Sequence, residues 1–250
     1  MRRMKPQEDP SCIIVGAGVN DVVPRTPQAQ QDCLIAADGG LDFLRAHTLT
    51  PDIVVGDFDS VSATPLSSDS PTSTVISLPA EKDDTDMTSA VKLGWERKYS
   101  LFHIYGGLGG RIDHTIANLQ LLVSIAEHGG VGFLHSSENV ITAISGAQLH
   151  FSAESATPTE MVSVFAFSDT AQHVCLHGLK YEVSDGQFHN TLPLGVSNEF
   201  TGRPATIGVG TGSLIVTLPQ NSLPESVELK RSRAQSFGTL TTHVSSLLAL

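Results

Sequence analysis

The chain has 250 residues, 40% of them hydrophobic and 16% charged, which is a globular composition and gives no reason to expect disorder. Its formal net charge of −11 argues against a general nucleic-acid binder and against a protein that binds anionic membranes. No apolar h-region follows the basic start, and no apolar run approaches the roughly 20 residues that span a bilayer, so we expect neither a signal peptide nor a membrane span.

The cysteines Cys12, Cys33 and Cys175 are widely spaced and form no CxxC pair. Such a set is typical of reduced, buried thiols and not of a disulfide or zinc framework. We therefore expect a cytoplasmic protein.

Short apolar, β-branched runs alternate with helical patterns through the first part of the chain. The predicted strands are 12–15, 33–37, 53–55, 74–78, 101–105 and 131–134. Several of these runs are apolar on both faces, as the strands of a parallel sheet are when helices cover it on both sides.

Two helices are predicted in the same region. One begins near Asp84 and Thr85, whose side chains can cap it. Its inward-facing residues are Met87, Ala90, Val91 and Trp95. The other follows Asp113 and is closed by Gly129 and Gly130. Its apolar stripe consists of Ile112, Ile116, Leu119, Val123 and Ala126.

The pattern changes after about residue 138 to short β runs separated by turn residues, which favours a small antiparallel domain. The predicted strands there are 139–144, 148–151, 161–167, 173–176 and 213–218, with a surface loop at 153–159. The sequence thus predicts an α/β N-terminal domain with a mostly parallel, Rossmann-like sheet (12–137) and a smaller all-β sandwich domain (138–219). A flexible C-terminal tail (220–250) is predicted to follow.

An acidic pair follows the strand 53–55. Asp57 and Asp59 flank Phe58 where ligands bind in an open parallel sheet, at the carboxyl end of a strand. Carboxylates in this position suit a hard cation such as Mg²⁺. Ordinary turn chemistry is the alternative, because Asp and Ser favour turns and caps.

A second acidic segment, 82–86, stands just before a predicted helix. Asp86 is a candidate metal ligand, and Lys82 is a candidate phosphate contact. The alternative is a solvated helix start, because acidic residues suit the first turn.

A glycine-rich segment, 106–110, follows the strand 101–105 and leads into Arg111, Asp113 and His114. Glycines let the backbone approach an anion, and Arg111 can bind phosphate through two hydrogen bonds. Gly110 belongs to this candidate phosphate site. We expect Asp113 to cap the helix as well, and packing or capping is the alternative for His114.

Two further turns are weaker signals. The Gly16-Ala17-Gly18 turn resembles the start of a dinucleotide fingerprint but lacks its third glycine. Asp38, before Gly39 and Gly40, adds a carboxylate at the same sheet edge, with a simple β-to-α turn as the alternative. No GxxxxGK[ST] element or Gly-x-Ser-x-Gly elbow is present, which argues against a P-loop kinase and a serine hydrolase.

Taken together and in this order, these motifs resemble the thiamine pyrophosphokinase (thiamine diphosphokinase) family. The matching segments are Asp38-Gly39-Gly40, Gly56-Asp57-Phe58-Asp59-Ser60, Asp83-Asp84-Thr85-Asp86 and Gly110-Arg111-Ile112-Asp113-His114. Two later segments, 178–181 and 197–200, resemble the family's thiamine-binding portion. The resemblance covers roughly residues 12 to 218, and the family usually has tryptophan where this chain has Tyr181.

The resemblance implies transfer of the pyrophosphoryl group of ATP to the hydroxyl of thiamine, with release of AMP, by a homodimer that binds thiamine between its protomers. It implies that Asp57, Asp59 and Asp86 hold Mg²⁺ and are catalytic together with Arg111. The implied nucleotide or phosphate contacts are Asp38, Lys82, Thr85, Gly110, Arg111, Asp113 and His114. The implied thiamine contacts are Tyr181, Ser197 and Asn198.

Two other functions remain as alternatives. The run from Asp57 to Val61 fits the DxDxV motif of a haloacid-dehalogenase-like phosphatase, although that motif normally lies on the first strand and Gly56 interrupts the apolar run. The other alternative is a non-catalytic nucleotide sensor that binds ATP with Mg²⁺ and shows no turnover.

Overall fold

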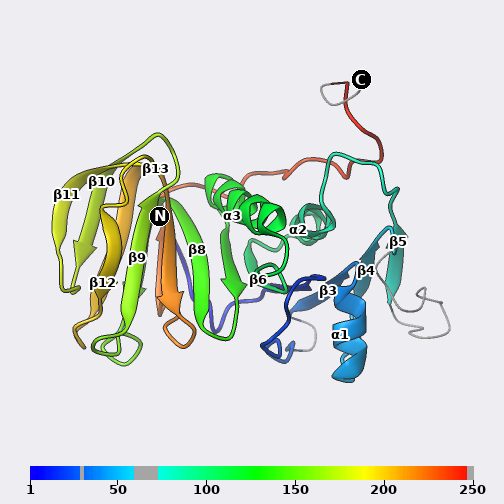
Figure 1. Cartoon of the computed structure of the whole chain (residues 1–250), viewed down its shortest axis with the longest axis horizontal. Coiled ribbons are helices and arrows are strands. Elements are labelled where there is room, and N and C mark those ends of the chain that lie inside the picture. Colours follow the sequence, from blue (N-terminus) through cyan, green and yellow to red (C-terminus); the bar gives the residue numbers. More distant parts are fainter. Residues whose placement is uncertain (29–30, 59–72, 247–250) are drawn as a thin grey trace. The chain divides into compact units, whose positions relative to one another are not determined.

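The structure is a computed structural model that describes residues 1–28, 31–58 and 73–246. The predicted ligand Asp59 lies outside these residues. The chain divides into two compact units (Figure 1). The α/β unit comprises Pro10–Asn118 with Gln235–Leu250, and the β unit comprises Met1–Asp9 with Leu119–Ala234.

The α/β unit contains a sheet whose neighbouring strands are parallel, in the order β6-β2-β3-β4-β5. These strands are β2 (Cys12–Val15), β3 (Cys33–Ala37), β4 (Ile53–Gly56), β5 (Thr74–Ser77) and β6 (Leu101–Tyr105). The helices are α1 (Gly40–Ala46), α2 (Asp86–Glu96) and the start of α3 (Ile112–Glu127). The five strands predicted between residues 12 and 105 are therefore confirmed to within one residue at each end.

Helices cover both faces of this sheet because its central strands are apolar at every position. Successive side chains of a strand point to opposite faces. On one face Ile13 and Leu34 belong to the same buried cluster as Leu44 of α1. On the other face α2 packs closely, since a Cβ at Gly94 would lie 2.8 Å from the Cys12 Sγ. The edge strand β5 has three exposed residues and one half-buried residue.

The helix predictions are confirmed for α2 and only in part for α3. All four predicted inward residues of α2 are buried. In α3, Val123 and Ala126 are buried and Gly129, in the left-handed region at φ +76°, follows the helix end as expected. The first two residues of the predicted apolar stripe are not buried, since Ile112 is 72% exposed and Ile116 is 51% exposed. A periodic pattern shows that a helix has an apolar face and does not show how far along the helix that face is covered.

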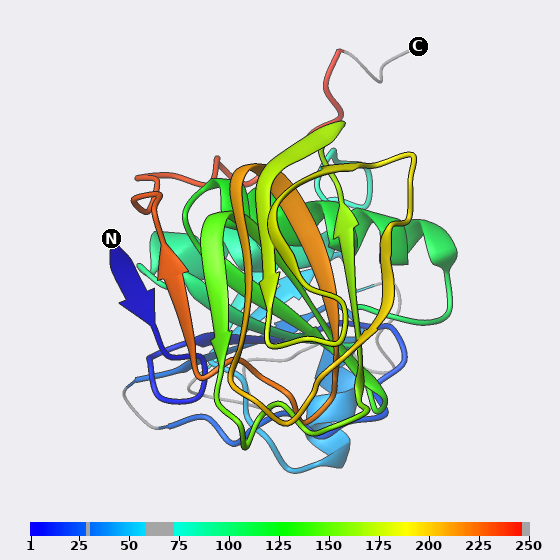
Figure 2. The ribbon, with the colours of Figure 1, turned by 90° about the vertical axis from the view of Figure 1, so that its left-hand side faces the viewer.

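The β unit is built from antiparallel pairs around two long strands, β8 (Asn139–Phe151) and β13 (Ala205–Pro219), which pair along their lengths. The first half of β8 pairs with β7 and the second half with β14. Likewise β13 pairs first with β10 and then with β9. Figure 2 shows β13 in orange among the green and yellow strands of this unit.

The remaining strands of the β unit flank this pair. They are β1 (Arg2–Met4), β7 (Val131–His135), β9 (Met161–Ala166), β10 (Thr170–His177), β11 (Val183–His189), β12 (Gly195–Glu199) and β14 (Ser226–Leu229). Their antiparallel partners are β14 for β1, β10 for β11 and β9 for β12.

Several β predictions are corrected. The segments 139–144 and 148–151 are one strand, because Gly146, at φ +56°, lets the backbone turn without ending the pairing. The predicted strand 213–218 is the second half of β13. Strands β11 and β12 were not predicted, whereas 153–159 lies outside the strands, as expected.

The predicted limits of the domains also differ from the compact units. Strand β7, predicted within 12–137, pairs antiparallel with β8 and belongs to the β unit. The stretch predicted as a flexible tail contains β14, whose four residues pair with β8 and which also pairs with β1. Only two of the four residues of β14 are apolar and the stretch around it is rich in polar residues, so only its pairing partners reveal it.

All three cysteines are free. Cys12 and Cys33 are buried as predicted, and Cys175 is only half-buried. Within the described part of the chain, no helix is long and apolar enough to cross a membrane.

Candidate active site

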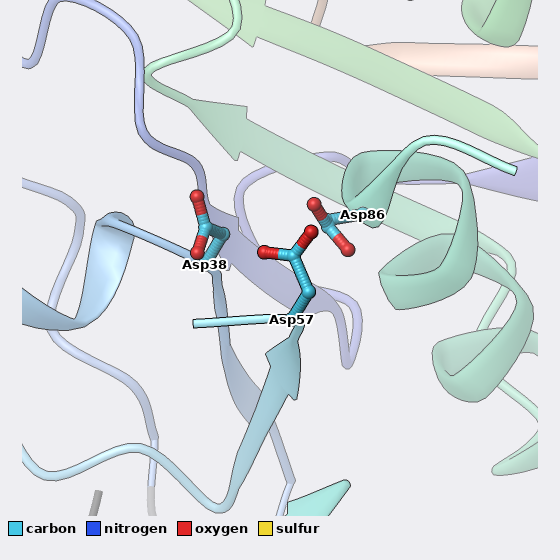
Figure 3. Close-up of side chains that lie close together, drawn as sticks. All are labelled: Asp38, Asp57 and Asp86. Atoms are coloured by element: carbon cyan, nitrogen blue, oxygen red, sulfur yellow. The ribbon is translucent and has the colours of Figure 1, made fainter. Parts of the chain in front are cut away.

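Three carboxylates meet at the carboxyl ends of the parallel strands. Asp38 follows β3, Asp57 follows β4, and Asp86 is the first residue of α2. One carboxylate oxygen from each lies within 4.8 Å of the others. Figure 3 shows the three side chains close together, with the carboxylates of Asp57 and Asp86 side by side. The structure therefore brings together two of the predicted metal ligands, Asp57 and Asp86, with Asp38, which the sequence suggested as a phosphate contact.

The close approach of β3 and β4 explains how the first two carboxylates meet. The backbone N–H of Asp38 donates a 2.8 Å hydrogen bond to the Val55 carbonyl. A Cβ at Gly56 would lie 3.0 Å from the Asp38 Cα, so a side chain at position 56 would push the strand ends apart. Asp38 itself is in the left-handed region at φ 48°, which Asp tolerates better than most residues.

Burial and like charge both act on the carboxylates of this cluster. Asp38 is only 8% exposed, and its Oδ1 has no hydrogen-bond partner among the residues that the structure describes. Burial raises the pKa of Asp86, and the nearby carboxylates of Asp38 and Asp57 raise it further, whereas Lys82 opposes the rise. Oxygen ligands around a shared volume are what a hard divalent cation requires.

Lys82 and Thr85 belong to the acidic segment and stabilise its conformation through their own contacts. The Lys82 side chain is 4% exposed, and its Nζ lies 3.1 Å from the Asp86 Oδ1 without hydrogen-bond geometry. The same Nζ donates to the Pro79 carbonyl at 3.0 Å. Thr85 is the N-cap of α2, since its Oγ1 accepts from the Thr88 N–H at 3.1 Å. Both residues line the cleft described next.

A cleft of about 740 Å³ opens beside the carboxylates. Its lining includes the glycine turns that follow β2 and β6, at 16–18 and 106–110. These turns touch, because the Gly18 N–H donates to the Gly106 carbonyl at 2.9 Å and a Cβ at Gly18 would lie 2.5 Å from that oxygen. The Gly16-Ala17-Gly18 turn, a weak signal in the sequence, is therefore part of the site.

The residues after Gly110 lie at the rim of the cleft. Gly110, Arg111 and His114 line it, and Arg111 forms an exposed ion pair of 2.6 Å with Asp113. A hydrogen bond from Arg111 lowers the pKa of Asp113. Asp113 is not the N-cap residue of α3, because the helix already begins at Ile112, but its Oδ1 accepts from the His114 N–H at 3.0 Å in the first turn.

The sequence reasoning missed Asn118, which also lines the cleft. This residue is 7% exposed, and its Nδ2 donates a 2.7 Å hydrogen bond to the Gly107 carbonyl. Asn118 thereby holds the glycine turn from α3. In the sequence, the only signal for Asn118 was that a polar residue stands next to the apolar stripe of the predicted helix.

The predicted thiamine contacts lie together in the β unit. The amide of Asn198 is buried and holds the backbone of Tyr181, accepting from its N–H at 2.9 Å and donating to its carbonyl at 2.7 Å. The Tyr181 side chain is 60% exposed, with the Lys180 Nζ 5.5 Å from the ring centre. Ser197 is in the left-handed region at φ 59°, and its N–H donates to the Ser163 Oγ.

Comparison with known proteins assigns both parts of the chain to one family. Residues 26–131 match the family model for the thiamin pyrophosphokinase catalytic domain. Residues 147–214 match the model for the thiamin pyrophosphokinase vitamin B1 binding domain. The two matches together cover more than half of the chain.

Individual proteins agree with this assignment. The chain is 27% identical over 208 residues to the thiamine pyrophosphokinase of Bacillus subtilis, a match that covers 81% of this chain and 95% of the relative. It is 26% identical over 176 residues to thiamin pyrophosphokinase 1 of Caenorhabditis elegans, which covers 67% of this chain and 71% of the relative.

The crystal structure of the Bacillus subtilis thiamine pyrophosphokinase has the same fold, with a TM-score of 0.73 at 24% identity and coverage of 84% of this chain and 98% of that one. The chain therefore belongs to the thiamin pyrophosphokinase family and is an enzyme of that family.

Proposed function

We propose that this enzyme transfers the pyrophosphoryl group of ATP to the hydroxyl of thiamine, giving thiamine diphosphate and AMP, with Mg²⁺ as its cofactor. The observation that carries this proposal is the cluster of Asp38, Asp57 and Asp86 beside a cleft lined by two glycine turns. Carboxylates for a metal and backbone N–H groups for phosphates are the parts that phosphoryl transfer needs, because positioning and charge neutralisation supply most of its catalysis.

The carboxylate cluster fits a divalent cation. Asp38, Asp57 and Asp86 offer oxygen ligands, and the Oδ1 of Asp38, which has no hydrogen-bond partner in the described part of the chain, gives the site an available ligand atom. When bound, Mg²⁺ would offset the charge of the polyphosphate. Asp59 lies outside the described residues, and its role as a further ligand and catalytic residue stays a prediction.

ATP would lie in the cleft of a Rossmann-like sheet, where the glycine turns let the backbone come close to the phosphates and the N-terminus of α2 favours anions. Arg111 suits the transferred group or the leaving AMP, because its exposed guanidinium can leave Asp113 for a phosphate without a burial cost. Lys82 would reach the same phosphates only by sharing its contact with Asp86. Thr85, Gly110 and His114 line the phosphate side, and Asp113 acts through Arg111.

Thiamine would bind at Tyr181, Ser197 and Asn198 of the β unit. Apolar side chains are exposed near this set in the sequence, with Leu192 at 56%, Leu194 at 62% and Val196 at 44%. A second protomer would cover such a surface, which supports a homodimer with thiamine bound at its interface. The free cysteines support a cytoplasmic location.

The test is incubation of the purified protein with ATP, Mg²⁺ and thiamine, followed by chromatography of the products. We expect AMP and thiamine diphosphate in equal amounts, and neither when thiamine or Mg²⁺ is left out. Formation of ADP would show a simple kinase instead. Inorganic phosphate released without thiamine would show a phosphatase, and binding of ATP without any product would show a nucleotide sensor.

A further inference from the structure

The C-terminal segment 235–246 is hydrogen-bonded to the acidic segment that leads into α2, and both belong to the α/β unit (Figure 1, red and teal). The Thr241 Oγ1 accepts from the Asp84 N–H at 3.0 Å, and the Thr241 N–H donates to the Asp84 Oδ2 at 3.1 Å. The Ser245 N–H donates to the Asp83 Oδ1 at 2.9 Å. Backbone groups and side chains of both segments thus take part in the contact.

Lys92 of α2 contacts both segments through its side-chain ammonium group. It is 8% exposed, and its Nζ lies 2.6 and 2.8 Å from the two carboxylate oxygens of Asp84. The same Nζ donates to the Thr239 carbonyl at 2.8 Å. Since a buried ammonium group needs partners for all its protons, Lys92 favours the arrangement in which both segments are present.

An aromatic contact holds the start of the segment. The Phe237 ring lies 5.2 Å from that of Trp95, the single tryptophan of the chain. Trp95 in turn stacks on Phe102 of β6, with ring centres 6.0 Å apart. The fluorescence of Trp95 therefore reports whether the segment is in place.

These contacts act next to the candidate active site. Asp84 lines the cleft, and only Thr85 separates it from the metal-ligand candidate Asp86. A segment that holds both the N–H and the carboxylate of Asp84 determines the direction in which the chain enters α2. That direction in turn places Asp86 and Lys82.

We propose that segment 235–246 is a strap that positions the metal-binding segment 82–86 from outside the cleft, with Thr241 and Lys92 as its positioning residues. The strap never touches the substrate and acts through Asp84. This inference rests on the proposed function, because it takes Asp86 as a metal ligand.

The test uses the full chain and four proteins: wild type, Thr241→Val, Thr241→Ser and Thr242→Val. Thr241→Val keeps the shape of the side chain and removes the hydroxyl that accepts from Asp84, whereas Thr241→Ser retains a hydroxyl. Thr242 is exposed, so Thr242→Val is a matched control. Mn²⁺ binding is measured by calorimetry without nucleotide, together with Trp95 fluorescence and thermal unfolding.

We expect Thr241→Val to weaken Mn²⁺ binding about tenfold, the lower end of the loss seen when a residue that orients metal ligands is removed. Its Trp95 emission should also shift, while Thr241→Ser and Thr242→Val bind Mn²⁺ like the wild type. Wild-type Mn²⁺ affinity in Thr241→Val overturns the strap, even if that variant unfolds at a lower temperature, because its role is then structural only.

Two further results separate the strap from the proposed function. A wild-type protein that binds no Mn²⁺ overturns the metal site itself, and the strap with it. If Thr241→Val fails to fold, Ser245→Pro replaces it. That change removes the N–H from which the Asp83 Oδ1 accepts and also restricts the backbone, so it loosens the strap at a second contact with the acidic segment. Unchanged Mn²⁺ affinity in Ser245→Pro also overturns the strap.

Discussion

At the scale of single residues, the main feature is that three acidic side chains share one small volume. Burial raises the pKa of Asp86, and the carboxylates of Asp38 and Asp57 raise it further. The ionised form of Asp86 therefore lowers the stability of the metal-free fold, so we regard the arrangement as built for a ligand. Natural proteins accept such local costs at functional sites.

The first prediction concerns Asp86→Asn. The pKa of Asp86 is higher in the folded protein than in the unfolded chain, so its ionisation destabilises the metal-free fold at neutral pH. The variant should therefore unfold at a higher temperature than the wild type at pH 7 in EDTA. It should also lose turnover by about a hundredfold or more, the scale of losing a principal charge-stabilising group.

The pH dependence of this difference checks its cause. As the pH falls through the raised pKa of Asp86, the wild type regains the lost stability, and the two melting temperatures should converge below about pH 3.9, the ordinary value for Asp. Asp185→Asn, an exposed change in the β unit, serves as the control. An Asp86→Asn protein that is less stable than the wild type at pH 7 contradicts the argument.

The second prediction compares Asp38→Asn with Asp59→Asn. Asp38 has a buried oxygen that no described residue hydrogen-bonds, and it lies inside the cluster, so Asp38→Asn should lower both Mn²⁺ affinity and turnover by about a hundredfold. The sequence predicts a loss of turnover of the same size, about a hundredfold or more, for Asp59→Asn. Near-wild-type turnover in either variant would show that the substituted residue is not a ligand of the metal.

At the scale of elements, the first residues of α2 contribute both to the stability of the helix and to the candidate active site. Thr85 caps the helix through its Oγ1, and the next residue is the metal-ligand candidate Asp86. Thr85 and Asp86 line the cleft, and a helix N-terminus favours anions, so the cap also supports an anion-binding position. Loss of the cap should therefore affect both folding and nucleotide binding.

The third prediction is that Thr85→Ala lowers the free energy of unfolding by about 1 kcal/mol, the usual cost of losing an N-cap. Because the first turn should loosen, KM for ATP should rise while KM for thiamine stays unchanged. Thr85→Ser, which keeps the hydroxyl, should restore both quantities. Urea unfolding and steady-state kinetics measure them, and equal changes in the two KM values would exclude a role for Thr85 at the nucleotide.

At the scale of the whole molecule, the proposed site residues are divided between the two units, since the carboxylates belong to one and Tyr181 to the other. The β unit exposes an apolar set, Leu192, Leu194 and Val196, that a monomer would leave in water. Burial of such side chains stabilises an association by about 25 cal/mol per Å² of apolar surface before the entropic costs of association. The homodimer proposed above would cover them.

The fourth prediction is that Leu194→Arg converts a dimer into monomers, because a charge at a buried apolar contact stays unpaired. Sedimentation velocity should show the change in mass, and thiamine-dependent formation of AMP should fall with it. Val23→Arg, at a residue of the α/β unit that is 57% exposed, is the control and should stay dimeric. If the Leu194→Arg protein remains dimeric, the dimer interface does not include Leu194.

The sequence by itself determined the local elements and the chemical types of the site. Strands such as β2 and β3 are apolar at every position, which only a sheet covered on both faces explains. The order of the acidic and glycine motifs identified the family and named Asp57 and Asp86. These signals are local, so they can be read without knowing which segments lie together.

Only the tertiary structure decided which distant residues share a space. It joined Asp38 to the carboxylate cluster, put the Gly16-Ala17-Gly18 turn and Asn118 around the cleft, and left Ile112 exposed. It also tied Thr241 to Asp84, across 157 positions of the chain. A periodic pattern describes how a residue relates to its neighbours along the chain, whereas these contacts depend on strand order and on the packing of helices against the sheet.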